Sequence, residues 1–333
     1  MAKEPMQQRK IQINAHGGAD QLVLTSVPLV APGPGQVRVQ HRAVGVNFID
    51  TYHRTGLYPL ALPSGLGLEA AGVIDAVGEG VTEFSVGQRV AYCSGPIGAY
   101  AESNIVPATN LLPLPDSISE ELAAASLLKG LTAAYLLLKT SQNQAGDTVL
   151  IHAAAGGVGQ ILCQWALTLN LRVIATVGRD EKMAVVQQLG CERVINYRTS
   201  PWVDWVRTCT NGQGVSVVYD GVGKDTFEDS LRCLMPRGLM VSYGNASGAV
   251  EGFSPLLLAK YGSLFLTRPT LADYVRDPAE FKALGSALFD VLQSGKVRPA
   301  ISHRLPLAQA DEAHRLLESG QTTGSVILTV EEK

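Results

Sequence analysis

The fold of this chain is decided by one stretch, Asp147-Thr148-Val149-Leu150-Ile151-His152-Ala153-Ala154-Ala155-Gly156-Gly157-Val158-Gly159. Its apolar first half predicts a buried strand, and residues 158–169 predict a helix. A glycine-rich turn between a strand and a helix can cradle a pyrophosphate, because the backbone can approach closely and the helix N-terminus offers N–H donors. Ala154 replaces the first glycine of the GxGxxG pattern, but the strand–turn–helix context still favours a dinucleotide site.

Strands and helices alternate after this turn. Short Val/Ile/Leu-rich runs occupy residues 172–177, 194–195, 215–220 and 238–244. Helical stretches lie between them, as at residues 181–189. Nearly continuous apolar strands are typical of a sheet that is covered on both faces. The alternation predicts an α/β fold with a doubly wound parallel sheet of the Rossmann type.

The end of the second strand indicates which dinucleotide to expect. An NAD site requires Asp or Glu there for the ribose 2′-hydroxyl, and this chain has Gly178. Arg179 and Lys182 lie nearby, where they could bind a 2′-phosphate, and Tyr197 follows the third strand. The neighbouring acidic residues suit the first turn of a helix and do not restore an NAD preference. We expect NADPH, while the alternative that Arg179 and Lys182 only form a solvated helix start stays open.

The two ends of the chain differ in pattern from the middle. Residues 11–115 alternate short apolar runs with Gly and Pro, which predicts an irregular, barrel-like β domain. A helix is expected at residues 119–138. Near the C-terminus, residues 279–294 and 307–319 predict helices, and residues 325–330 predict a strand. Strand material at both ends suggests that the C-terminal segment completes the first domain.

The length of 333 residues is enough for two domains. We expect residues 1–125 and 268–333 to form the β domain, and residues 126–267 to form a Rossmann domain inserted into it. The domains are then not consecutive halves of the chain.

Charge and composition exclude several classes of protein. The sum of 27 Lys and Arg against 30 Asp and Glu is −3, which excludes a strongly basic nucleic-acid binder. The longest apolar stretch, near residues 122–138, is interrupted by Lys129 and predicts no membrane span. Five dispersed cysteines without a CxxC pair, in a chain without an apolar leader, predict reduced thiols and a cytoplasmic protein.

Several segments together carry a family resemblance: Val46-Asn47-Phe48-Ile49-Asp50-Thr51-Tyr52, Gly65-Leu66-Gly67-Leu68-Glu69-Ala70-Ala71-Gly72, Val86-Gly87-Gln88-Arg89-Val90, the turn at residues 154–159, and Val241-Ser242-Tyr243-Gly244-Asn245-Ala246-Ser247-Gly248. With them the chain resembles the zinc-free quinone oxidoreductase (zeta-crystallin-like) group of the medium-chain dehydrogenase/reductase superfamily. Likeness to bacterial NADPH:quinone reductases rests on Asn196-Tyr197-Arg198 and Thr267-Arg268-Pro269. The resemblance implies a GroES-like β-barrel catalytic domain, a Rossmann domain, and reduction of quinones by NADPH.

The departures from zinc-dependent relatives bear on the mechanism. Those enzymes hold a catalytic zinc with Cys, His and a further Cys or acid, and the corresponding places here hold Asn47 and Leu68. Neither side chain ligates zinc, and the structural lobe with four cysteines is missing. The resemblance therefore implies no metal, and a hydride acceptor that needs no Lewis acid, such as a quinone.

The resemblance also implies site residues, with the acceptor site in the cleft. Asn47, Asp50 and Tyr52 form the expected catalytic set: Tyr52 would donate a hydrogen bond to the reduced oxygen, and Asn47 would orient the cofactor or the acceptor. Asp50 is a poor proton donor unless burial raises its pKa, and a structural role for it stays open, as does plain packing for Tyr52. The expected cofactor contacts are Asn47, Thr132, Gly156, Gly157, Val158, Gly159, Gly178, Arg179, Lys182, Tyr197, Val222, Gly244, Asn245, Ala246, Phe265, Leu266 and Thr267.

Two other functions stay open. The same scaffold could reduce the double bond of an α,β-unsaturated carbonyl compound. A protein that holds NADPH and contacts RNA, or a structural crystallin-like protein, has little support from the net charge.

Family likeness further implies a homodimer, formed through a sheet edge at residues 239–243 or 263–266. The histidines at positions 53, 152, 303 and 314 are expected in satisfied polar or surface roles.

Overall fold

The computed structural model describes residues 6–331, and the chain divides into two compact units. The first unit takes residues 1–128, 277–289 and 299–333, and the second takes residues 129–276 and 290–298. The expected layout put the crossing points after residues 125 and 267. Two crossings fall inside the helices α2 (Glu120–Tyr135) and α9 (Pro278–Gln293), and a sequence pattern does not show which half of a helix packs with which unit. Residues 1–5 and 332–333 of the expected β domain lie outside the described residues.

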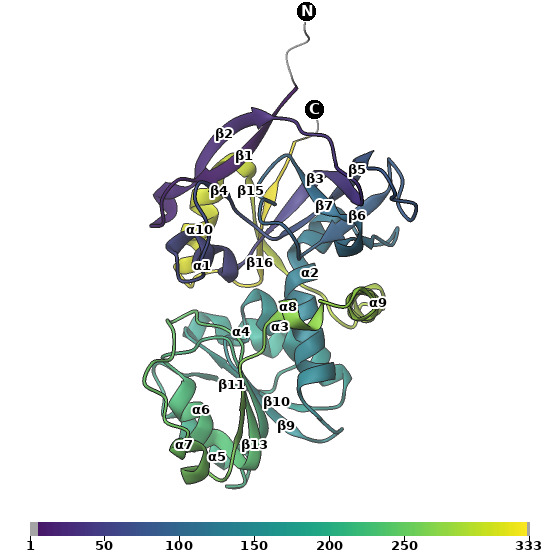
Figure 1. Cartoon of the computed structure of the whole chain (residues 1–333). Coiled ribbons are helices and arrows are strands. Elements are labelled where there is room, and N and C mark those ends of the chain that lie inside the picture. Colours follow the sequence, from purple (N-terminus) through teal and green to yellow (C-terminus); the bar gives the residue numbers. More distant parts are fainter. Residues whose placement is uncertain (1–5, 332–333) are drawn as a thin grey trace, which may run out of the picture. The chain divides into compact units, whose positions relative to one another are not determined.

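The second unit is an α/β layer structure (Figure 1). Its elements are β9 (Thr148–Ile151), α3 (Gly157–Thr168), β10 (Arg172–Val177), α4 (Met183–Gln188), β11 (Arg193–Asn196), α5 (Trp202–Cys209), β12 (Val215–Asp220), α6 (Phe227–Cys233), β13 (Leu234–Ser242), α7 (Leu256–Lys260), β14 (Phe265–Thr267) and α8 (Leu271–Tyr274). Figure 1 shows α5, α6 and α7 on one side of the sheet, with α3 and the second half of α2 on the other.

The six strands of this sheet are all parallel, in the order β11-β10-β9-β12-β13-β14. Counted from β9, this is the order 3-2-1-4-5-6 of a doubly wound dinucleotide-binding sheet. Leu150, Ile174, Val218 and Met240 lie in register on four neighbouring strands, and all are fully buried. Burial on both faces explains the unbroken apolar runs in the sequence. The expected parallel sheet is confirmed.

One helix of this unit has no clear signal in the sequence. Helix α5 is eight residues long and begins after Pro201. Its Trp202 and Val206, four positions apart, are buried in the core with Phe227 and Leu231 of α6. A helix this short is marginal alone, so tertiary packing of one apolar side stabilises it.

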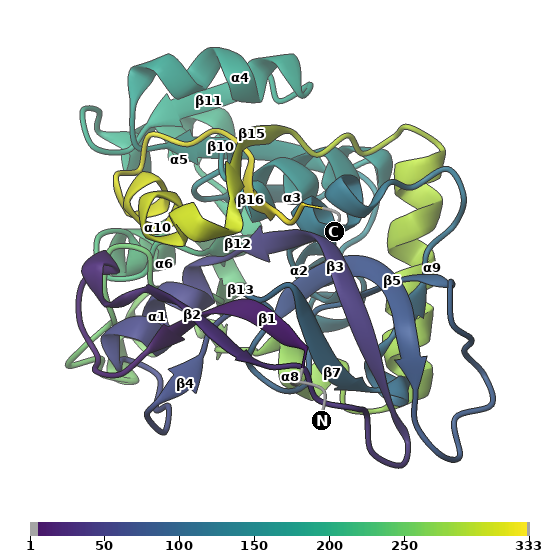
Figure 2. The same cartoon turned by 90° about the horizontal axis from the view of Figure 1, so that it is seen from above.

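The first unit is mostly antiparallel β structure (Figure 2). Its elements are β1 (Gln7–Ile13), β2 (Val23–Pro28), β3 (Gln36–Val46), α1 (Phe48–Thr55), β4 (Ser64–Gly65), β5 (Glu69–Val77), β6 (Arg89–Tyr92), β7 (Ser103–Pro107), β8 (Leu112–Pro113), β15 (Ile301–Pro306), α10 (Ala310–Glu318) and β16 (Ser325–Thr329). A three-stranded sheet, β2-β1-β4, and a seven-stranded sheet enclose one apolar core.

Strand β3 organises this unit because it has three partners. One edge pairs with β5, while on the other edge its first half pairs with β7 and its second half with β16. The register Val46↔Val326 and Ala43↔Thr329 joins the two ends of the chain. Strand β16 therefore lies in the sheet of the first unit, beside β3.

One helical segment, Glu120–Thr140, is long and apolar enough to cross a membrane by length and composition. It comprises α2 and a π-helical turn, Leu136–Thr140. Of its most apolar window, 78% is buried inside the protein, as in the core helix of a folded domain. Ser119 begins the segment as expected, since its Oγ accepts the backbone N–H of Leu122 at 3.2 Å.

Candidate functional site

The parallel sheet of the second unit brings the ends of its strands to one edge. In sheets of this order, ligands bind beyond the carboxyl ends, where the strand order reverses between β9 and β12. The loops that follow the strands at this edge hold many of the expected cofactor residues: Gly156, Gly157, Val158, Gly159, Gly178, Arg179, Lys182, Tyr197, Val222, Gly244, Asn245 and Ala246.

The turn after β9 is shaped around one carbonyl group. Ala153 has a left-handed backbone (φ 50°), and its oxygen accepts the N–H of Gly156 at 2.9 Å. A Cβ on Gly159 would lie 2.3 Å from that oxygen and 2.7 Å from the Ala154 Cα, so only glycine fits there. The N–H groups of Gly157 and its two successors begin α3 and have no acceptors within the helix. This backbone arrangement fits a pyrophosphate.

A buried chain of hydrogen bonds lies at the start of this turn. The Ser230 hydroxyl donates to the Thr226 carbonyl (2.7 Å), so its oxygen accepts from His152 Nε2–H (2.9 Å). His152 Nδ1 then accepts from the Thr176 hydroxyl at 2.7 Å. Burial lowers the pKa of His152, an effect that the Asp220 carboxylate opposes. The neutral ring thus connects β9, β10 and α6, which is the satisfied polar role expected for it.

The loops after β12 and β13 are fixed by a second buried group. Asp220 accepts from the N–H groups of Val222 (2.7 Å) and Gly223 (3.1 Å) and from the Thr226 hydroxyl (2.8 Å). Gly244 packs against this loop, since a Cβ there would lie 2.5 Å from the Gly221 oxygen. Sequence reasoning missed Asp220, although an Asp at the end of a buried strand could have indicated it.

The residues around Gly178 form a basic group at the ends of β10 and β11. A Cβ on Gly178 would lie 3.4 Å from Tyr197 Oη and 3.5 Å from Arg198 Nε, so these two side chains lie over it. Arg198 Nε donates to Tyr197 Oη at 3.3 Å. Burial, and then the nearby Arg179 guanidinium, lower the pKa of Lys182. Sequence reasoning quoted Arg198 but did not count it as a site residue, because Tyr197 brings it near only in the fold.

The acidic residue beside this group is turned to another partner. Asn196 Nδ2 donates to Asp180 Oδ1 at 2.8 Å. Asp180 also stands in the first turn of the short 3-10 helix Asp180–Lys182, where a negative charge is favourable. This is the role that the sequence predicted for it.

The remaining expected cofactor residues of this unit are on β14 and α2. Phe265 is 62% exposed, and Leu266 and Thr267 are partly buried. Strand β14 pairs with β13 through Leu239↔Phe265, and it is the last strand of the sheet. Thr132 is buried on α2.

In the first unit, the expected catalytic residues gather on α1. Asn47 caps the helix, and the Asp50 carboxylate accepts the Asn47 N–H at 2.9 Å as part of a capping box. The Tyr52 ring is half-buried and meets the Tyr58 ring edge-on, with centroids 5.2 Å apart. Asn47 and Asp50 therefore fix the start of the helix that carries Tyr52.

Asp50 is fully buried at one end of a polar chain. The Tyr100 hydroxyl donates to Asp50 Oδ2 (2.9 Å) and accepts from His314 Nε2–H (3.0 Å). His314 Nδ1 accepts from Arg54, which pairs with Glu318 at 2.6 Å. Burial lowers the pKa of His314 to about 3, and burial and Asp50 raise that of Tyr100 well above its ordinary value. These contacts match the structural role that the sequence left open for Asp50.

A surface pocket of about 430 Å³ lies elsewhere on the second unit. It is lined by Gln164, Leu167, Thr168, Gln188, Leu189, Lys296 and Arg298, none of which is an expected site residue. The two cationic side chains of the pocket, Lys296 and Arg298, lie beside the C-terminal turns of α3 and α4, whose carbonyl groups they complement.

Within residues 6–331, no three His, Cys, Asp or Glu side chains gather where they could hold a metal.

Two family models match the chain. Residues 33–116 match an alcohol dehydrogenase GroES-like domain, and residues 189–328 match a zinc-binding dehydrogenase domain. These matches, with the strand order above, confirm the expected combination of a GroES-like and a Rossmann-type domain.

Full-length relatives extend this likeness. A quinone oxidoreductase of Pseudomonas aeruginosa is 48% identical, with 96% of this chain and 99% of the relative covered. A 2-haloacrylate reductase of a Burkholderia species is 44% identical, over 95% and 97%. The crystal structure of Escherichia coli quinone oxidoreductase complexed with NADPH matches with a TM-score of 0.95 at 44% identity, covering 97% of this chain and all of that chain.

Proposed function

The chain belongs to the quinone oxidoreductase family of the medium-chain dehydrogenase/reductase superfamily, and from this premise we propose that it reduces quinones with NADPH and without zinc. The observation that carries the proposal is the strand-end edge of the second unit, where a backbone cradle and a basic group occur in one site. A bound NADPH supplies the hydride from its nicotinamide ring.

The cradle binds the pyrophosphate of the cofactor, and the basic group binds the 2′-phosphate of its adenosine ribose. N–H groups of Gly157 and Val158 at the start of α3 hold the pyrophosphate. Lys182, Tyr197 and Arg198 bind the 2′-phosphate, because Gly178 leaves room beneath them and puts no carboxylate there. The neighbouring Asp180 is held by Asn196 and does not oppose this binding.

The nicotinamide end is held by the loops after β12, β13 and β14. Asp220 fixes the backbone of Val222, and Gly244 packs against that loop. The backbone of residues 265–267 and the Thr132 hydroxyl complete the expected contacts. Our proposal is that these groups orient the ring and its carboxamide.

In this proposal, residues of α1 bind and orient the quinone. Reduction of a quinone to a hydroquinone adds a hydride and a proton, and the oxygen far from the hydride gains negative charge. The Tyr52 hydroxyl donates a hydrogen bond to that oxygen, and Asn47 orients the acceptor by fixing the start of the helix that carries Tyr52. Asp50 acts through the helix start and does not supply the proton, because its carboxylate accepts two hydrogen bonds in full burial.

One relative favours a second candidate function, the reduction of an activated carbon–carbon double bond. The Burkholderia relative at 44% identity is named a 2-haloacrylate reductase, and its substrate class has a double bond polarised by a carboxylate. Delivery of a hydride to such a carbon makes the same demands on the cofactor site. Side-by-side rates with a quinone, an enone and 2-chloroacrylate separate the two functions.

We further propose a cytoplasmic homodimer. Within residues 6–331, strand β14 pairs along one edge only, and its Phe265 is 62% exposed. The alternative edge at residues 239–243 is wrong, because β13 pairs with β12 on one side and with β14 on the other. A sedimentation series tests the dimer, and a monomer at every concentration would refute it.

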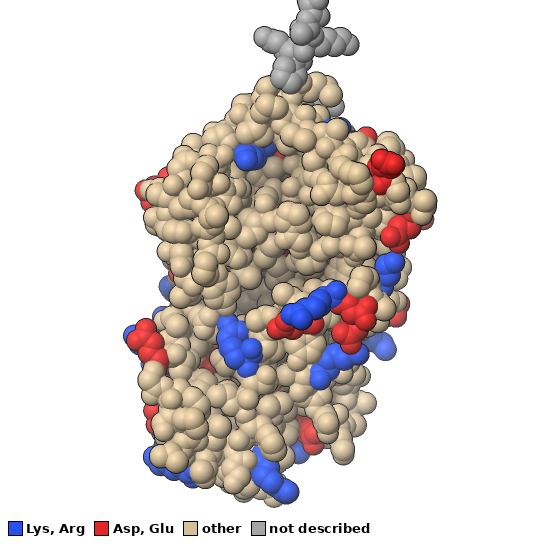
Figure 3. Space-filling view, in the orientation of Figure 1, with Lys and Arg blue, Asp and Glu red and all other residues tan. Residues whose placement is uncertain are grey.

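On the face shown in Figure 3, Lys and Arg are interspersed with Asp and Glu and form no continuous basic stripe.

Steady-state oxidation of NADPH and NADH with benzoquinones and naphthoquinones tests the main proposal. We expect turnover with NADPH, a kcat/KM for NADPH at least ~10-fold above that for NADH, and no loss of rate after chelator treatment. Absence of NADPH oxidation with every quinone refutes the activity, and a preference for NADH refutes the cofactor assignment. A rate that falls with the chelator and returns with Zn²⁺ refutes the metal-free mechanism.

A further inference from the structure

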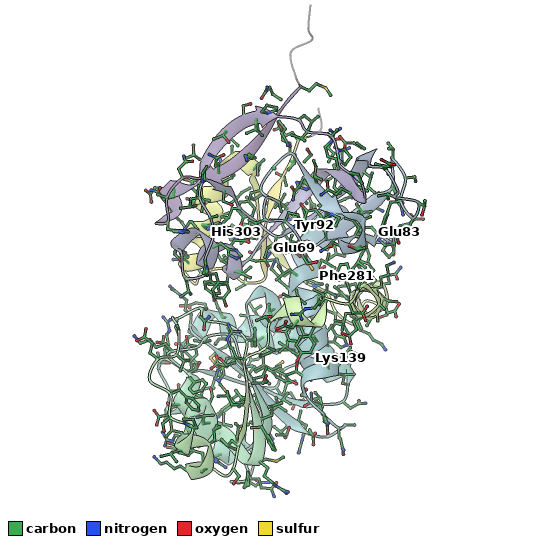
Figure 4. All side chains as sticks on the ribbon, in the orientation of Figure 1. Glu69, Glu83, Tyr92, Lys139, Phe281 and His303 are labelled. Carbon is green, nitrogen blue, oxygen red and sulfur yellow. The ribbon has the colours of Figure 1, made fainter. Side chains whose placement is uncertain are left out.

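Glu69, labelled in Figure 4, is a fully buried acid at the start of β5. Both of its carboxylate oxygens are used: Oε2 accepts from Asn47 Nδ2 at 2.8 Å, and Oε1 accepts the backbone N–H of Leu128 at 2.7 Å. One carboxylate thus connects β5, the N-cap of α1 and the middle of α2.

The surroundings of this carboxylate leave it little freedom. A Cβ on Gly45 of β3 would lie 2.0 Å from Glu69 Oε2 and 2.4 Å from the carbonyl oxygen of Ala124 on α2. The missing side chain at position 45 therefore makes the space that the carboxylate fills. Because both donors are N–H groups, only a side chain with two acceptor atoms satisfies this place.

The contact with Glu69 fixes which way the Asn47 amide points. An Asn side chain can turn its NH₂ or its oxygen toward a partner, and a carboxylate accepts only from the NH₂. The Asn47 oxygen is then directed to the helix start, where Asn47 and Asp50 form the capping box of α1. The helix start and the ring of Tyr52, five residues on, depend on this choice.

We propose that Glu69 is a positioning residue: it orients the Asn47 amide and so sets the start of the helix that carries Tyr52. This assignment rests on the proposed quinone reductase activity. Glu69 itself touches neither the cofactor nor the acceptor in this scheme.

A pair of substitutions that exchanges the hydrogen-bond donor and acceptor between positions 47 and 69 tests the proposal. In Glu69→Gln, one side-chain oxygen faces two N–H donors, so one donor loses its partner. In Asn47→Asp, two buried carboxylates meet at hydrogen-bond distance. The double variant keeps these two contacts, with the polarity of the first reversed: the new amide at position 69 donates its NH₂ to the new carboxylate at position 47, and its oxygen accepts from Leu128. An Asp also remains a good N-cap.

We expect each single substitution to lower kcat at least ~10-fold, while Glu69→Gln leaves the Kd for NADPH within ~2-fold of the wild type. The double variant should recover kcat to within ~3-fold of the wild type. Glu102→Gln is the matched control: Glu102 is also a buried acid of this unit, with contacts to the Arg9 side chain and backbone, and its loss should leave kcat unchanged.

Unfolding by urea, measured for all variants, separates positioning from folding. Wild-type kcat in Glu69→Gln, or effects on kcat that simply add in the double variant, would overturn the proposal. Recovery of stability in the double variant without recovery of kcat would overturn it as well, because Glu69 would then be structural only. A wild-type chain with no quinone turnover would instead refute the proposed function, and the positioning role with it.

Discussion

Gly159→Ala is the substitution for which the structure gives the sharpest expectation. The new Cβ would lie 2.3 Å from the Ala153 oxygen and within 2.8 Å of two atoms of Ala154, whereas real Cβ contacts essentially never fall below 3.0 Å. The Ala153 carbonyl must therefore recede by about 0.7 Å, the difference between 3.0 and 2.3 Å. Since all three contacted atoms are backbone atoms, no side chain can turn away to relieve the clash.

Two losses follow from this shift. Overpacking of a tight site costs about 1–3 kcal/mol of the free energy of unfolding, which lowers Tm by about 2–4 °C per kcal/mol in a domain of this size. The N–H groups at the start of α3 move with the turn, and loss of one hydrogen bond to the charged pyrophosphate, about 1.5–3 kcal/mol, weakens NADPH binding by about 10–100-fold. Titration of NADPH by fluorescence and a thermal melt measure the two losses separately.

Gly156→Ala is the matched control on the same turn. Its Cβ would lie 3.2 Å from the Ala153 oxygen, and its φ of −78° suits any residue. We expect its Tm to stay within about 1 °C of the wild type. If Gly159→Ala melts and binds NADPH like the wild type, the shape assigned to the turn is wrong.

Three further predictions concern other parts of the chain. Lys182→Ala and Arg198→Ala should each raise KM for NADPH by about 10–100-fold and leave KM for NADH unchanged, since each removes a charge-assisted hydrogen bond of about 1.5–3 kcal/mol; equal effects on both cofactors would contradict the 2′-phosphate site. Burial lowers the pKa of His41 to about 4 and that of His314 to about 3, so the unfolded chain takes up protons first as the pH falls below 6.5. These histidines should leave stability unchanged above that pH, and His41 alone should lower it by about 3 kcal/mol between pH 6.5 and 4; unfolding midpoints that do not change over this range would refute the sign. Tyr52→Phe should lower kcat for quinones by about 10–100-fold with an unchanged Tm, and a wild-type kcat would leave Tyr52 with packing only.

The second unit was the more predictable part of the fold. Strands such as β10 (Arg172–Val177) and β12 (Val215–Asp220) lie where the apolar runs predicted them, because strands buried on both faces carry an unbroken apolar signal. Helix α5 gave no such signal, because its stability comes from Trp202 and Val206 packing on α6. The sequence leaves a free edge at residues 239–243 possible, because no local pattern shows that β14 pairs with it.

The candidate site divides in the same way. Gly156 to Gly159 and Gly178 could be found from spacing, because a phosphate turn and the end of the second strand are local features. Arg198, Asp220 and Glu69 act through contacts with residues that are distant in sequence or on other elements, and their residue types alone suit many surface or core roles.

The sequence by itself determined the strand–turn–helix of residues 147–169, the alternation that follows it, and the absence of an acid at Gly178. Each of these follows from short-range sterics and periodicity, which neighbouring residues specify. Only the tertiary structure decided that β3 joins the two ends of the chain. It also decided that the Asp50 carboxylate is buried and accepts hydrogen bonds from Asn47 and Tyr100. The physical reason is that burial and hydrogen-bond partners are set by residues far apart in the chain, which meet only when the core closes.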